Sequence, residues 1–154
     1  MSLYEDLVIQ NSHIPIGDTF KSKSNFRGLY DLGVIVIDKN LSETRKAEVL
    51  YEELSHRKLT CGDITDQSQF NNRKFERYAV RDSYECALPL HKFIEAYNHN
   101  VSNLFELADY VQLSERYVLD VIEHYKLKYG LSTFCGDYLI RFDPLEVFKY
   151  TNFD

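Results

Sequence analysis

Two carboxylates and an imidazole lie close together in one short segment of this chain, as Glu52, Glu53 and His56. The surrounding sequence, Val49–His56, has the pattern of a helix. A helix turns by about 100° per residue, so Glu52 and His56 share one face and Glu53 lies near its edge. Carboxylates and imidazoles are common ligands of divalent metals, and a carboxylate beside them can act as a general base. The spacing therefore predicts a helix with two metal ligands and one base.

A hydrolytic zinc site needs three protein ligands and one open position. Glu76 is the best candidate for the third ligand, because it lies near the start of the next predicted helix. The loop between the two helices is long enough for them to pack side by side. Glu53 would activate the attacking water and pass its proton to the leaving amine. Asp63, in the loop, could hydrogen-bond to His56 and orient it.

The same residues also have an interpretation without a metal. Adjacent glutamates on a helix often form a solvated face, and a histidine near a helix C-terminus often complements the helix dipole. Zinc-peptidase helices usually read His-Glu-x-x-His, and here Glu52 stands in place of the first histidine. Two carboxylates neutralise the ion more fully, which predicts weaker hydrolytic power and a preference for harder ions such as Mn²⁺ over Zn²⁺. Zn²⁺, Mn²⁺ and no metal are all retained as alternatives.

Composition restricts the class of protein. The chain has 154 residues, 44% of them hydrophobic, which is enough for a core. Its net charge of -6 argues against nonspecific binding to nucleic acid or to an anionic membrane. The chain has an odd number of cysteines, Cys61, Cys86 and Cys135, and no two of them have Cys-x-x-Cys spacing. A disulfide framework is therefore not expected, which favours a reducing cytoplasm. We see neither a signal peptide nor a membrane-spanning segment.

Hydrophobic periodicity and turn residues predict the elements that position these residues. In the first half they predict a helix at 3–11, a polar loop at 17–25, strands at 26–30 and 34–38 joined as a hairpin, a helix at 43–57 capped by Ser42, and a loop at 58–71 over the site. In the second half they predict helices at 72–87 and 90–98, a helix capped by Ser102, a helix at 115–129 between Ser114 and Gly130, a hairpin or strand within 131–143, and a short final helix from Pro144.

The segment from Ser102 to Tyr129 has the rhythm of a helix-turn-helix. Its recognition helix would be residues 115–124, which carry more acidic than basic side chains. A helix that reads DNA needs donors for phosphates and base edges. We therefore favour packing or docking of a partner protein, and keep direct DNA binding as a weaker alternative.

Several segments, in this order and spacing, resemble the ImmA/IrrE family of zinc metallopeptidases. The chain looks most like the short members found beside repressors in phages and integrative elements of Gram-positive bacteria. The resemblance runs from about residue 26 to residue 148. The segments are Gly28-Leu29-Tyr30, Val34 to Ser42, Leu50 to His56, Gly62-Asp63-Ile64, Asn72-Arg73-Lys74 with Glu76 and Ala79, Leu107-Ala108, Tyr125 to Gly130, and Tyr138-Leu139-Ile140 with Phe142.

This resemblance implies an α+β fold in which a small antiparallel sheet packs beside a gluzincin-like active-site helix. We expect a metallopeptidase-like core over residues 1–100 and a helical and hairpin extension over residues 101–154, packed as one compact unit. By position, Glu53 matches the general base, His56 the second helical ligand and Glu76 the downstream acidic ligand. Besides Glu52, the chain departs from the family pattern at Val80 and Asp82, where Asn and Phe are usual.

The resemblance also implies a function in the cytoplasm of a bacterial host. The protein would cleave or inactivate a helix-turn-helix repressor of the same mobile element and so derepress its genes. The alternative is a non-catalytic anti-repressor that binds the same partner. A helix-turn-helix DNA-binding protein is the weaker alternative.

Overall fold

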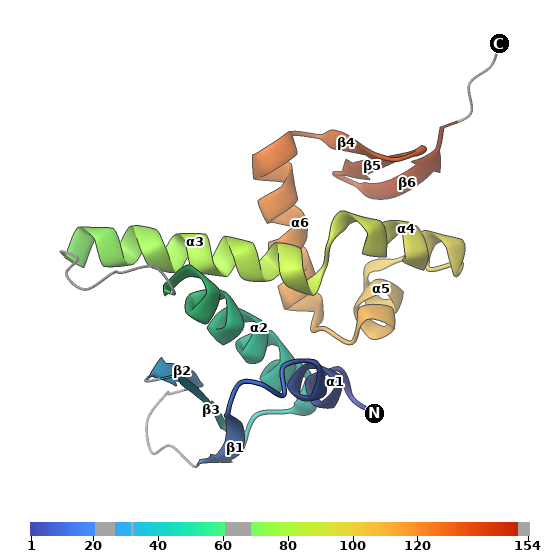
Figure 1. Ribbon diagram of the computed structural model, residues 1–154. Helices are drawn as coiled ribbons and strands as arrows, with labels where there is room; N and C mark the ends of the chain where they lie inside the picture. Colours follow the sequence, from blue (N-terminus) through green and yellow to red (C-terminus); the bar gives the residue numbers. More distant parts are fainter. Residues whose placement is uncertain (21–26, 32, 61–68, 151–154) are drawn as a thin grey trace. The chain divides into compact units, whose positions relative to one another are not determined.

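The computed structural model describes residues 1–20, 27–31, 33–60 and 69–150 (Figure 1). Its helices and its two three-stranded sheets confirm the predicted α+β class. The chain divides into two compact units, Met1–Ser83 and Tyr84–Asp154, so the boundary lies within helix α3 (Gln69–Ala87). The predicted boundary after residue 100, between a metallopeptidase-like core and a C-terminal extension, lies C-terminal to this structural boundary and stays a prediction. No described helix is long and apolar enough to cross a membrane.

The sheet of the first unit contains β1 (Ile16–Phe20), β2 (Gly28–Asp31) and β3 (Val34–Asp38), in the order β1-β3-β2. The pairing of β2 with β3 is antiparallel, which confirms the predicted hairpin. The prediction of a loop at 17–25 is wrong for residues 17–20, because β1 pairs with β3 in parallel and makes the sheet mixed. The edge strand is held by backbone pairing, and its Gly-Asp-Thr sequence shows none of the alternation by which strands are detected.

Helix α2 (Glu43–Thr60) lies against this sheet and against α1 (Leu3–Gln10). The backbone N–H of Arg45 donates to Oγ of Ser42 at 3.2 Å, so Ser42 caps the helix as predicted. Besides the apolar residues Ala47, Val49 and Leu50, α2 buries four polar side chains, which are Lys46, Glu48, Glu53 and Ser55. The core of this unit consists of Tyr4, Leu7, Ile14, Ile35, Ile37, Ala47, Val49 and Leu50.

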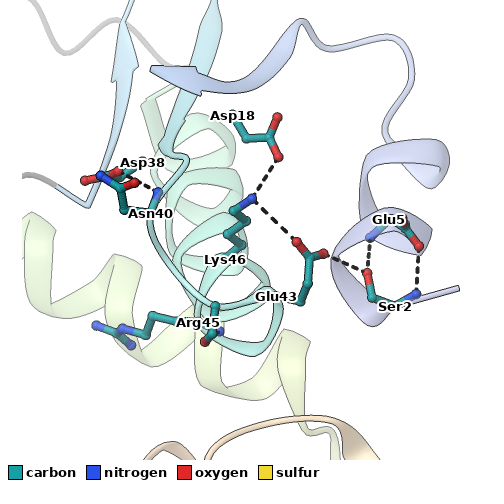
Figure 2. A network of polar contacts seen from close by, with 9 residues as sticks. Ser2, Glu5, Asp18, Asp38, Asn40, Glu43, Arg45 and Lys46 are labelled. Atoms are coloured by element: carbon teal, nitrogen blue, oxygen red, sulfur yellow. Dashed lines mark hydrogen bonds and ion pairs between the residues drawn. The ribbon is translucent and has the colours of Figure 1, made fainter. Parts of the chain in front are cut away.

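A polar network fixes the first turns of α2 (Figure 2). Nζ of Lys46, a buried side chain, lies 3.1 Å from Oδ2 of Asp18 on β1 and 3.5 Å from Oε1 of Glu43. Oγ of Ser2, the N-cap of α1, donates to Glu43 at 3.0 Å. Burial alone would lower the pKa of Lys46, but Asp18 and Glu43 outweigh it and raise this pKa. The network therefore joins α1, β1 and α2 at the end of α2 remote from His56.

The second unit contains α4 (Leu90–Asn98), α5 (Leu104–Val111), α6 (Glu115–Tyr129) and a second sheet. Pro89 is the N-cap of α4, and α6 lies between its N-cap Ser114 and Gly130, as predicted. The N-cap of α5 is Asn103 rather than Ser102, whose backbone N–H and Oγ instead donate to Glu106.

The second sheet has the order β4-β5-β6, from β4 (Ser132–Cys135), β5 (Tyr138–Phe142) and β6 (Leu145–Lys149). Its first two strands confirm the predicted hairpin. The predicted final helix from Pro144 is wrong, because β6 pairs antiparallel with β5 from Leu145 onward. Exposure alternates along Leu145, Glu146, Val147 and Phe148, and this period of two belongs to a half-buried strand.

The contact of β2 with α2 predicts a difference between two glycines of the first sheet. A Cβ at Gly28 would lie 2.6 Å from Cγ1 of the buried Val49, whereas a Cβ at Gly17 would have no atom within 4 Å. We expect Gly28→Ala to lower the free energy of unfolding by about 1–3 kcal/mol through overpacking. The matched Gly17→Ala should leave it unchanged or raise it by up to about 1 kcal/mol. Urea unfolding measures both, and equal effects would contradict the tight contact.

Candidate metal centre

Helices α2 and α3 bring together the three side chains that the sequence singled out as metal ligands. One donor atom from each of Glu52, His56 and Glu76 can be chosen so that all three lie within 4.8 Å of one another. Nε2 of His56 lies 3.0 Å from Oε2 of Glu76. All three residues belong to the first unit. The predicted juxtaposition of two residues of α2 with one residue of α3 is therefore present in the structure.

The donor set fits a divalent metal in both chemistry and size. Two carboxylates and one imidazole suit Zn²⁺ and Mn²⁺. The donors of a tetrahedral zinc site lie about 3.3–3.6 Å apart, so the three side chains, whose donors lie within 4.8 Å of one another, would move closer together to ligate an ion. The Glu76 side chain is 55% exposed and the His56 side chain 18% exposed. Solvent therefore reaches the site from the side of Glu76.

Glu53 lies beside this set as the buried acid of the site. Its Oε2 is 3.8 Å from Nδ1 of His56, and the backbone of Tyr30 on β2 hydrogen-bonds to its carboxylate. Burial is the largest influence and raises the pKa of Glu53 to about 6, with the charges of Glu52 and Glu76 acting in the same direction. His56 and the Tyr30 hydrogen bond lower this pKa in part. A carboxylate with a pKa near 6 is well suited to accept a proton near neutral pH.

Strand β2 is a part of the site that residue types alone did not reveal. A Cβ at Gly28 would lie 3.4 Å from both Cγ and Oε1 of Glu53, so the strand passes directly over this side chain. The available signal was the glycine itself, since a glycine inside a strand often marks a close approach. The contribution of Tyr30 is a backbone group, and its side-chain type could not indicate it.

Other side chains hold the two helices together near the site. Phe75 on α3 packs edge-on against His56, with ring centroids 6.1 Å apart. Nζ of Lys58 lies 2.7 Å from Oδ2 of Asp82, which joins the last turns of α2 to α3. Asp63 and Cys61 lie outside the described residues.

Comparison with known families adds an independent finding. A family model described as the IrrE N-terminal-like domain, Peptidase_M78, matches residues 12–120. The matched region contains all five residues predicted for the site, which are Glu52, Glu53, His56, Asp63 and Glu76. No protein of known, curated function matches the chain.

The raised pKa of Glu53 predicts how metal-free protein responds to pH. The folded state holds the Glu53 proton more tightly than the unfolded state, so the free energy of unfolding falls as pH rises from about 4.5 to about 6. The Glu53→Gln variant has no ionisable group at this position, so its free energy of unfolding should lack this decrease. In the presence of a chelator we expect the variant to be more stable than the wild type by about 1–2 kcal/mol at pH 7.5, and equal to it at pH 4.

Urea unfolding at the two pH values measures this difference. Glu123→Gln, at an exposed position of α6, is the control and should show no pH-dependent gain. A Glu53→Gln protein no more stable than the wild type at pH 7.5 would contradict the assigned burial cost.

Proposed function

The chain belongs to the IrrE N-terminal-like family of peptidases, and on this premise we propose that it is a metal-dependent endopeptidase that inactivates a repressor protein. The family membership makes it a metallopeptidase-like member of the ImmA/IrrE group. The observation that supports catalysis is the convergence of three donor side chains from α2 and α3 beside the buried carboxylate of Glu53.

In this proposal each residue has one role. Glu52, His56 and Glu76 would hold the ion, which when bound supplies Lewis-acid polarisation of the scissile carbonyl and a nucleophile at neutral pH. Glu53 takes the proton from the attacking water and delivers it to the nitrogen of the leaving amine. The hydrogen bond from Tyr30 orients the Glu53 carboxylate, and the close strand at Gly28 shields it from bulk water.

The proposed substrate is a helix-turn-helix repressor of the mobile element that encodes the chain. This choice rests on the resemblance to short family members encoded beside repressors. Cleavage would remove the repressor and derepress the genes of the element, as in prophage induction.

A non-catalytic anti-repressor is the second candidate, and one observation favours it. The 3.0 Å contact between His56 and Glu76 already gives these side chains a polar partner without a metal. In that case the site would stabilise a surface that binds the repressor and leaves it intact. DNA binding is disfavoured by the acidic composition of the second unit, which has eleven Asp and Glu against six Lys and Arg.

The substitution of the first histidine by Glu52 predicts the metal preference. We expect the wild type to bind one divalent ion, and Glu76→Ala to lose it. Glu52→His restores a neutral imidazole and should raise the ratio of Zn²⁺ to Mn²⁺ affinity by about tenfold, because softer nitrogen ligands favour zinc. Competitive dialysis followed by metal analysis measures the ratio, with the exposed Glu115→His as a control for added histidine. An unchanged ratio would exclude Glu52 as a ligand.

If the protein is a peptidase, cleavage of the repressor should depend on the general base Glu53. The wild type, Glu53→Gln and Glu123→Gln are each co-expressed with the repressor encoded beside the chain, and the length of the repressor is followed by immunoblot. We expect cleavage and derepression with the wild type and with Glu123→Gln, and a full-length, active repressor with Glu53→Gln. Equal derepression by all three with an uncut repressor would exclude the peptidase and support the anti-repressor.

A further inference from the structure

The second unit contains an apolar groove of 610 Å³ that is separate from the metal centre. Its walls come from α4, α5 and α6, with Phe93, Leu107 and Ile122 among the lining residues. The segment from Asp143 to Phe148, which includes most of β6, lines the remaining side. In Figure 1, β6 is the strand of its sheet that lies nearest to α4. A cavity of this size has the dimensions of a ligand-binding site.

The groove follows the open edge of β6. This strand is the last in the order β4-β5-β6, so no described strand pairs with its other edge. Consecutive residues from Asp143 to Phe148 line the groove, whereas a strand that presented one face would contribute alternate residues. The groove therefore borders the backbone of β6 as well as its side chains.

The pairing register shows which backbone groups of β6 face outward. The N–H of Tyr150 donates to the carbonyl of Asp137, which makes these two residues a hydrogen-bonded pair. Such pairs alternate along an antiparallel ladder, so the backbones of Phe148 and Glu146 face β5. The N–H and C=O groups of Leu145, Val147 and Lys149 point away from β5, toward the open edge.

Charge further restricts the occupant. The lining residues include two acidic side chains, Asp143 and Glu146, and no basic one. Asp143 is paired with Lys126 at 3.0 Å and Glu146 with Arg141 at 2.6 Å, so both acids are partly neutralised. The acidic composition of the unit and the absence of a lysine or arginine in the lining disfavour an acidic ligand and suit a neutral or basic one.

We propose that this groove binds an extended, neutral or basic peptide segment of a partner protein, which adds to β6 as a further strand. Outward backbone groups of β6 form the ladder with the peptide, and alternate apolar side chains of the peptide enter the groove between the helices. This site lies outside the metal centre, and its occupation does not depend on the proposed peptidase activity.

Two leucines on α6 provide a matched pair of variants. Leu119 lines the groove and is 46% exposed, whereas Leu127 is 78% exposed and is not among the lining residues. A random seven-residue peptide library displayed on phage is selected on the full wild-type chain and counter-selected on Leu119→Asp. We expect enriched peptides that alternate apolar residues and contain Lys or Arg. Their affinity should fall by about tenfold or more with Leu119→Asp, because a charge replaces apolar contact area, and stay within about threefold with Leu127→Asp.

The strand geometry is tested on the peptide, which leaves the protein unchanged. Two synthetic analogues of an enriched peptide carry N-methyl groups on alternate backbone amides, one in each register. Because only alternate amides of a strand face its neighbour, one analogue should lose about tenfold or more in affinity and the other should retain most of it. Fluorescence anisotropy measures both, with the metal removed by a chelator.

A variant of β6 gives a second measure of the same geometry. Val147→Pro deletes an outward N–H without removing a bond to β5, and Val147→Ala is its control. We expect weaker peptide binding by Val147→Pro than by Val147→Ala. Failure to enrich any peptide over Leu119→Asp would overturn the proposal, as would equal affinity of the two methylated analogues.

Discussion

The close contact of β2 with α2 is the constraint on which the candidate site depends. At Gly28 the strand lies so close to α2 that an added Cβ would be 2.6 Å from Cγ1 of Val49 and 3.4 Å from Cγ of Glu53. That approach buries the Glu53 carboxylate, brings the Tyr30 backbone within hydrogen-bonding reach, and raises the pKa of Glu53 to about 6. Two carboxylates of the site, those of Glu52 and Glu76, are therefore accessible to water, whereas the third, that of Glu53, is buried. The environment, rather than the residue type, separates their roles.

The two ends of α2 are held by different kinds of interaction. At its beginning, the buried Lys46 links Asp18 and Glu43, and Ser2 extends this link to α1. At its end, the contacts are to α3, through the pair of Lys58 with Asp82 and through Phe75 against His56. Exposed ion pairs such as that of Lys58 contribute little to stability. The position of Glu76 relative to His56 therefore depends on the packing of α3 more than on any single polar bond.

Much of the fold and of the site could be predicted from the sequence, because the strongest signals are local. The spacing of Glu52, Glu53 and His56 predicted that they share one face of a helix. The length of the loop after this helix allowed Glu76 to be predicted as the third ligand. What could not be predicted depends on backbone groups or on distant pairing. β1 has a polar sequence and exists because its backbone pairs with β3. Pro144 suggested the start of a helix, but the alternating burial of the residues after it places them in a strand beside β5. Tyr30 contributes through its backbone amide, and this contribution cannot be predicted from the type of its side chain.

The sheet formed by β4, β5 and β6 begins at Ser132, beyond the residues 12–120 that the family shares. The metal-site residues therefore lie in the common part of the chain, while the strand edge that borders the groove lies in a part that the family model does not include. If the groove binds the proposed peptide, the strand edge that would pair with it lies outside the matched region, whereas the proposed catalytic residues lie inside it. Substitutions in the last sheet would then change which peptide is accepted while leaving the residues of the candidate metal centre unchanged.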